Sequence, residues 1–105
     1  MNAGIEKVFG LLTICRKAGR MVMGFDPVKE AVMTDKAKAV FLATDISAKT
    51  EKEVRFFARS KDIPVLSLGA AIAEIEFAVG RKAGVIGICD EGFAKKLTEL
   101  TGENP

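Results

Sequence analysis

Short apolar runs and segments with helical spacing alternate along the whole of this chain. Apolar residues three and four positions apart predict helices, and continuous short apolar runs predict buried strands. The resulting order is helix–strand four times over, closed by a helix. This alternation predicts an α/β fold, a three-layer α/β/α sandwich with a mixed sheet of about four strands. The strands are expected at 21–23, 39–43, 63–68 and 85–89, and the helices at 3–17, 26–34, 48–60, 69–79 and 91–101.

Polar residues with capping chemistry mark several of the expected helix starts. Asp26 is expected to cap the second helix, with Pro27 at its first position, where a missing N–H costs nothing. Either Asp45 or Ser47 could cap the third helix, and Asp90 is expected to cap the last one. These assignments leave the three aspartates little room for catalysis.

Composition and length limit the classes of protein that this chain can belong to. The 105 residues predict a single domain, 1–105, and contain no apolar run long enough to span a membrane. The start of the chain lacks the pattern of a secretory signal, so the expected location is cytoplasmic, and residues 103–105 are expected to fray. There is no histidine, and Cys15 and Cys89 are far apart, so no metal site, cofactor or catalytic triad is expected. Both thiols are expected to be buried.

Phosphate-binding and phosphotransfer enzymes are disfavoured by missing motifs. Neither GxGxxG nor GxxxxGK[ST] follows any expected strand. The glycines at 80 and 84 precede a strand, so Gly80 is better explained as the end of a helix. No pair of carboxylates is placed to hold Mg²⁺ at a strand end.

A nucleic-acid surface is better supported. The argument for it is that basic residues cluster around particular turns, and it does not depend on the net charge of the chain. The net charge is only +2, and ordinary solubilising loop charges are the alternative explanation. Two groups, one around the first strand and one before the last strand, can share a rim of the sheet, and Lys49 could join them. Phe25 is the only aromatic on a candidate loop, which favours recognition of a folded RNA by backbone and shape. The residues expected to face RNA are Arg16, Lys17, Arg20, Gly24, Phe25, Asp26, Lys29, Arg81 and Lys82.

Several stretches together resemble the L7Ae/L30e superfamily of ribosomal proteins, and within it the small bacterial ribosomal-like proteins of the YlxQ type. The similarity runs over roughly residues 5–100, and the order and spacing of the stretches carry it. They are Leu11-Leu12, 16–20 (RKAGR), 23–26 (MGFD), 37–47 (AKAVFLATDIS), 78–82 (AVGRK) and 85–94 (VIGICDEGFA).

This resemblance implies an α/β/α sandwich that binds RNA and catalyses no reaction. Members that bind kink-turn RNA carry Gly-x-Asn-Glu-x-x-Lys where the first strand meets the second helix, and a further contact loop that corresponds here to residues 80–84. Gly24 matches the glycine, but Asp26, Pro27 and Glu30 stand where Asn, Glu and Lys are expected. Lys29 is one position early, and one residue turns a helical side chain by about 100°. The resemblance therefore supports the fold more strongly than it supports kink-turn recognition.

Two functions follow as expectations. The first is a non-catalytic RNA-binding protein, associated with the ribosome and recognising structured, kink-turn-like RNA, with ribosomal proteins as further partners. The second is a protein-interaction module of the same fold that has lost kink-turn recognition, which the changes at Asp26, Pro27 and Glu30 favour.

Overall fold

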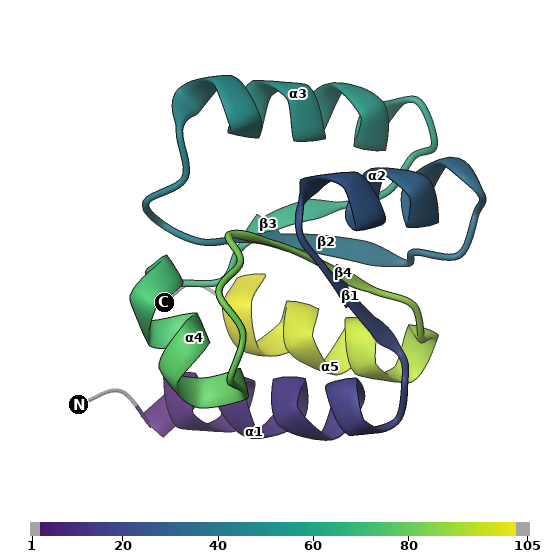
Figure 1. Ribbon diagram of the computed structural model, residues 1–105. Helices are drawn as coiled ribbons and strands as arrows, with labels where there is room; N and C mark the ends of the chain where they lie inside the picture. The colour runs from purple at the N-terminus through teal and green to yellow at the C-terminus, as the bar shows by residue number, and fades with distance from the viewer. Residues whose placement is uncertain (1–2, 103–105) are drawn as a thin grey trace.

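The computed structural model describes residues 3–102 and places five helices and four strands within them (Figure 1). The three-layer α/β/α sandwich and its mixed four-stranded sheet are confirmed. The predicted fraying of residues 103–105 lies outside the described residues. The elements are α1 (Ala3–Lys17), β1 (Met21–Met23), α2 (Phe25–Met33), β2 (Ala39–Leu42), α3 (Ala48–Arg59), β3 (Val65–Ser67), α4 (Ile72–Val79), β4 (Val85–Ile88) and α5 (Glu91–Gly102).

The sheet has the strand order β1-β4-β2-β3, so the last strand of the chain lies inside it. β4 runs antiparallel to both β1 and β2, whereas β2 and β3 are parallel. All four residues of each central strand, β2 and β4, are buried, as their continuous apolar sequences predict. β3 is an edge strand, and Pro64, which cannot donate to a strand ladder, directly precedes it as expected.

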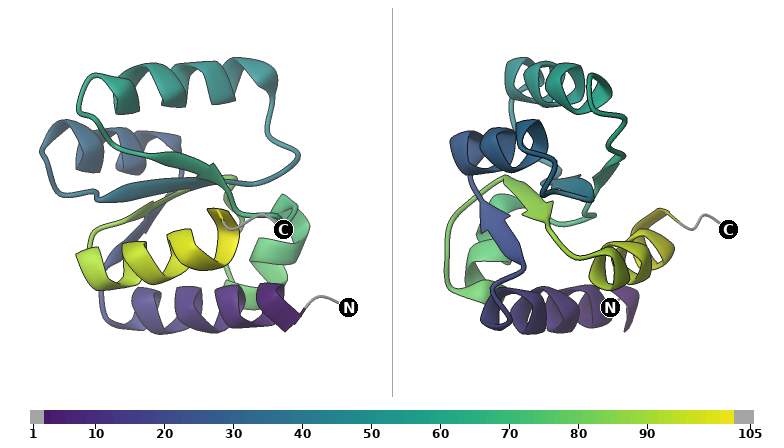
Figure 2. Two further views of the ribbon diagram at one scale, coloured as in Figure 1. Left: turned by 180° about the vertical axis from the view of Figure 1, so that it is seen from behind. Right: turned by 90° about the vertical axis from the view of Figure 1, so that its right-hand side faces the viewer.

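Helices cover both faces of the sheet (Figure 2). α2 and α3 lie together on one face, and α1, α4 and α5 cover the other. Each face has its own apolar core, because a side chain from one strand points alternately to the two sides. In β2, for example, Val40 packs with Val54 beneath α3, while Phe41 packs with Leu12 of α1.

The two cysteines differ more than their similar surroundings in the sequence predict. Cys15 is fully buried, but Cys89 is only half-buried, so the expectation of two buried thiols was wrong for Cys89. Cys89 follows the end of β4, where the chain leaves the sheet. Removal from water is the main reason that the pKa of Cys15 rises to about 11, with smaller contributions from Asp90 and Cys89.

The start of α2 differs from the sequence prediction. The helix begins at Phe25, so Gly24 is the N-cap and Asp26 lies inside the first turn without capping it. Gly24 has φ 106° and ψ 156°, a region of backbone conformation almost restricted to glycine. This geometry lets the chain turn directly from β1 into the helix, and it places the cap two residues before Asp26, where the sequence pattern predicts it. Pro27 still lies in the first turn, where no N–H needs a helical acceptor.

The caps of the other helices explain a second difference. Ser47 accepts a hydrogen bond from the Thr50 N–H (3.1 Å) and caps α3, and Asp90 accepts one from the Phe93 N–H (2.9 Å) in α5. Asp45 instead accepts from the N–H of Ile72 (2.9 Å), at the start of α4. Because that helix begins at Ile72, the prediction of a helix from Gly69 was wrong: Gly69, with φ 81°, belongs to the turn that follows β3.

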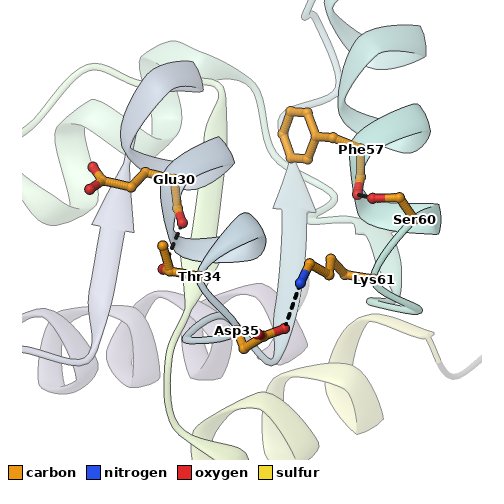
Figure 3. Close-up of polar contacts among 6 residues, drawn as sticks. All are labelled: Glu30, Thr34, Asp35, Phe57, Ser60 and Lys61. Carbon is orange, nitrogen blue, oxygen red and sulfur yellow. Dashed lines mark hydrogen bonds and ion pairs between the residues drawn. The ribbon is translucent and has the colours of Figure 1, made fainter.

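The far ends of α2 and α3 are joined by an ion pair. The ammonium group of Lys61, just after α3, lies 3.1 Å from a carboxylate oxygen of Asp35, just after α2 (Figure 3). Within each segment a hydroxyl closes the last turn, with Thr34 donating to the Glu30 carbonyl and Ser60 to the Phe57 carbonyl. The Phe57 ring extends from α3 toward α2 in the same view.

Candidate nucleic-acid interface

One end of the sheet collects four chain segments that are far apart in the sequence. β1, β2 and β3 all end there, and β4 begins there, because β4 runs opposite to the other three strands. Backbone hydrogen bonds join the segments, from Gly24 to the Val85 carbonyl (2.8 Å) and from Ala43 to the Gly84 carbonyl (2.9 Å). We call this end the loop edge; it lies at the left of Figure 1.

Three helices start at the loop edge, and only α2 starts without a side-chain cap. Ser47 caps α3, and Asp45 and Glu74 accept the N–H groups of Ile72 and Ala71 at the start of α4. At the start of α2 no side chain accepts a hydrogen bond from the first turn. Free N–H groups and the helix dipole together attract anions, phosphate included. The start of α2 is therefore the one of these three that is open to an anionic ligand.

The loop from Gly80 to Gly84 leads into β4 next to this open helix start, because the Val85 carbonyl accepts the N–H of Gly24. Gly80 ends α4 in the left-handed conformation (φ 80°), which confirms its predicted role. The next two residues, Arg81 and Lys82, are exposed, whereas Ala83 is buried. Gly84 is closely surrounded: a Cβ atom on it would lie 2.5 Å from Cγ2 of Ile46. The close packing at 83–84 anchors the loop and leaves its two cations in solvent.

Arg16, on α1, reaches the base of the same loop from the face of the sheet that α1 and α4 share. Its guanidinium donates a hydrogen bond to the Val79 carbonyl, in the last turn of α4, and lies next to Gly80. Carbonyl groups at a helix C-terminus lack helical partners and favour a cation. Arg16 therefore joins α1 to the base of the loop.

The structure does not bring Lys17 and Arg20 to the loop edge. The Arg20 carbonyl accepts the N–H of Cys89, beyond the end of β4, whereas Gly24 pairs with Val85 at its beginning. At roughly 3.4 Å per residue, the two positions are more than 10 Å apart along the sheet. The sequence places these residues close together in number, but a whole strand separates Arg20 from Gly24.

Phe25 is held by packing instead of standing free as a stacking surface. Its ring meets that of Phe57 edge to face, with centroids 5.7 Å apart and planes inclined by 76°. Lys29, one turn along α2, borders a groove between α2 and α3. Lys49 lines the same groove, so it lies on the same side of the molecule as Lys29. Asp26 and Glu30 are exposed on the same helix and bring negative charge to it.

Sequence reasoning missed the contacts that shape the loop edge. Nothing local predicts that Asp45 caps α4, because Asp45 and Ile72 are 27 positions apart. The packing of Ile46 and Ile72 against Gly84 is likewise visible only once the topology brings their three loops together. A glycine directly before an apolar strand was the one available signal of close packing.

Two kinds of feature are absent from residues 3–102. No three side chains of the His, Cys, Asp or Glu type gather there to hold a metal ion. No helix in that part of the chain is long and apolar enough to cross a membrane.

Comparison with known proteins decides the family. Residues 6–98 match the ribosomal protein L7Ae/L30e/S12e/Gadd45 family. The chain belongs to this family. The match includes β1, the start of α2 and the loop 80–84, so the whole loop edge lies inside the L7Ae-type domain.

Individual relatives cover nearly the full chain. The RNA-binding protein YlxQ of Enterococcus faecium is 36% identical over 101 residues, 95% of this chain and 97% of its own. The Bacillus subtilis (strain 168) RNA-binding protein YlxQ is 31% identical over 93 residues, covering 88% and 92%. These relatives confirm the resemblance to the YlxQ type.

Two solved structures share the fold. A protein of unknown function from Bacillus halodurans C superposes with a TM-score of 0.86 at 31% identity, covering 92% of this chain and 98% of that one. The 15.5kD RNA binding protein of Giardia lamblia superposes with a TM-score of 0.74 at 16% identity, covering 97% and 88%. The second comparison bears on the fold alone.

Proposed function

We propose that residues 1–105 form a single, non-catalytic domain that binds structured RNA through the loop edge, in the cytoplasm and in association with ribosomes. Membership of the L7Ae-type family and the RNA-binding relatives support this assignment. The observation that assigns it to a surface is the uncapped start of α2 at Gly24, which bonds to β4 directly after the loop that carries the exposed Arg81 and Lys82. Ribosomal RNA and ribosomal proteins are the proposed partners.

Each part of the loop edge has a role in this proposal. The free N–H groups in the first turn of α2 donate hydrogen bonds to a phosphate, and the absence of a side chain at Gly24 lets the RNA backbone come close. Arg81 and Lys82 neutralise neighbouring phosphates, while Arg16 steadies the loop that carries them. Lys29 extends the positive surface along α2.

A role in RNA contact is less well supported for Lys17 and Arg20, because they lie at the opposite end of β1. In this proposal they reach RNA only if the ligand extends along the sheet past β1. Phe25 contributes by holding the start of α2 against α3, through its contact with Phe57. Asp26 stands in the first turn as a charge that limits affinity for phosphate.

Salt titration against a ribosomal or kink-turn RNA tests the proposal. If about four phosphates are neutralised, log K should fall against log salt with a slope of roughly −3 to −4. The double substitution of Arg81 and Lys82 by alanine should weaken binding and make the slope shallower. Lys95→Ala with Lys96→Ala, on α5, is the matched control and should leave both unchanged. A slope near zero, or equal effects of the two double variants, would reject the loop edge as the RNA site.

A second candidate function is a protein-interaction module that no longer recognises kink-turns, and the observation favouring it is the negative charge of Asp26 and Glu30 at α2. Replacing them by Asn and Lys should raise affinity for a kink-turn RNA if the loop edge binds it, because two repulsive charges are removed. An unchanged affinity would favour the second function. Purification from cells separates the two as well: nuclease-sensitive ultraviolet absorbance indicates bound RNA, and a stable protein partner indicates the module.

A further inference from the structure

A groove of about 800 Å³ runs between α2 and α3, on the face of the sheet that carries only these two helices. Its floor is apolar and includes the paired rings of Phe25 and Phe57. Two further apolar side chains at the groove project into solvent: Met33 is 44% exposed and Phe56 is 78% exposed. An aromatic ring left this exposed beside an apolar floor is typical of an interaction surface.

The rim of the groove is positively charged. Lys29, Lys49 and Lys52 line it against one acidic residue, Glu53, so its net charge is +2 (three positive charges less one negative). None of the three lysines forms an ion pair or a side-chain hydrogen bond within residues 3–102. Elsewhere on α3, Arg55 is paired with Glu51 at 2.9 Å. The lysines at the groove are thus available to an acidic ligand.

The dimensions of the groove suit a short helix. α3 has 12 residues, which at about 1.5 Å per residue gives a wall roughly 18 Å long. About three turns of a partner helix fit along this length. Beyond the C-terminal ends of both helices, the Lys61–Asp35 ion pair holds the two walls together (Figure 3).

From these features we propose that the groove binds an amphipathic helix of another protein, with apolar side chains on one face and acidic residues flanking them. The apolar face covers Phe56 and Met33, and the carboxylates pair with Lys29, Lys49 and Lys52. Helix-in-groove recognition of this kind depends on anchors at positions i, i+3, i+4 and i+7. The flexible thioether of Met33 can adapt to the packing of the partner.

Two other occupants fit less well. A second copy of this chain would bring the three rim lysines against the same lysines, because a twofold interface is self-complementary. RNA would satisfy the lysines but not the floor, since Phe25 and Phe57 pack edge to face with each other and offer no open stacking platform. The groove shares Lys29 with the surface proposed for RNA, whereas Lys52, Phe56 and Met33 have no role in that proposal.

The test uses a fluorescein-labelled synthetic helix of 14 residues with leucines at the four anchor positions, glutamates at the positions that flank them and alanines elsewhere, titrated with the full chain. A second peptide with lysines in place of the glutamates is the control ligand. The first peptide should bind and the second should not. Phe56→Ser should weaken binding about tenfold or more, as removal of an aromatic anchor does, and Lys52→Glu should weaken it severalfold.

Matched variants keep this experiment decisive. Phe77→Ser removes an even more exposed phenylalanine (94%, against 78% for Phe56) from α4, and Lys95→Glu reverses an exposed charge on α5; both should leave peptide affinity unchanged. All four positions are exposed, so the fold should tolerate each change. Absent binding, equal binding of both peptides, or equal effects of Phe56→Ser and Phe77→Ser would overturn the proposal. Loss of RNA affinity, or loss of a dimer in sedimentation, on Phe56→Ser would assign the groove to RNA or to a second copy instead.

Discussion

Replacing Gly24 by alanine should destabilise the protein through backbone strain alone. The position has φ 106° and ψ 156°, and holding a non-glycine residue in such a region costs about 1–3 kcal/mol. Space is not the obstacle, because an added Cβ would lie 3.5 Å from Cδ of Pro27, an ordinary contact. Alanine also restricts the unfolded chain, which returns about 0.4–1 kcal/mol. Taking about 0.7 kcal/mol for this gain, the free energy of unfolding should fall by about 0.3–2.3 kcal/mol.

Thermal and urea unfolding of wild type, Gly24→Ala and Gly10→Ala would measure this effect. A central loss of about 1.3 kcal/mol corresponds to a Tm lower by about 5–10 °C in a chain of this size. Gly10 lies inside α1 with nothing within 4 Å of an added Cβ, so Gly10→Ala should stabilise the protein by about 0.5–1 kcal/mol. The reasoning is refuted if Gly24→Ala unfolds at the wild-type temperature or above, or if the two variants shift in the same direction.

Three further predictions concern caps, packing and a thiol. Asp45→Ala should lower the free energy of unfolding, measured by urea titration, by about 1 kcal/mol, because the N–H of Ile72 loses its acceptor. Asp45→Asn keeps an acceptor oxygen, so a loss in Asp45→Ala no larger than the loss in Asp45→Asn would contradict this role. Gly84→Ala should cost about 1–3 kcal/mol by crowding Ile46, and a neutral result would mean that the loop can move aside. Burial raises the pKa of Cys15 to about 11, so the thiol ionises at a lower pH in the unfolded chain than in the folded protein. The free energy of unfolding should therefore fall as pH rises from about 9 to about 11. Cys15→Ala should lack this component, and identical pH profiles of the two proteins would exclude it.

The architecture could be predicted from the sequence because each strand and helix carries its own periodic pattern. Apolar residues in the central strands 39–42 and 85–88 are buried on both sides, which a continuous apolar run anticipates. Helix starts were harder to predict. Asp26 has the chemistry of a cap, but a glycine conformation at the preceding turn begins the helix earlier. At α4 the cap comes from Asp45 in a different loop, which no local pattern can reveal.

The sequence likewise predicted some parts of the candidate site and not others. Gly24 and the end of the loop 80–84 meet because the strand order brings the end of β1 beside the start of β4, as expected from the sequence for a shared rim. Closeness in sequence is a poorer guide to which residues share the site. Arg20 is four positions from Gly24, yet an extended strand carries it to the other end of the sheet. The side-chain bond from Arg16 to Val79 depends on the packing of α1 against α4, which residue types alone do not specify.

The inner position of β4 has a consequence for how the chain matures during synthesis. β1 and β2 are not neighbours in the sheet; they are separated by a strand that the ribosome makes only after residue 84. Until residues 85–88 emerge, both strands expose open edges and neither apolar core can close. A nascent chain stalled after α4 should thus remain open to proteases, and a premature stop there should yield a fragment for degradation instead of a weaker version of the protein. Completion of the C-terminal quarter acts as the step that commits the whole chain to its folded state.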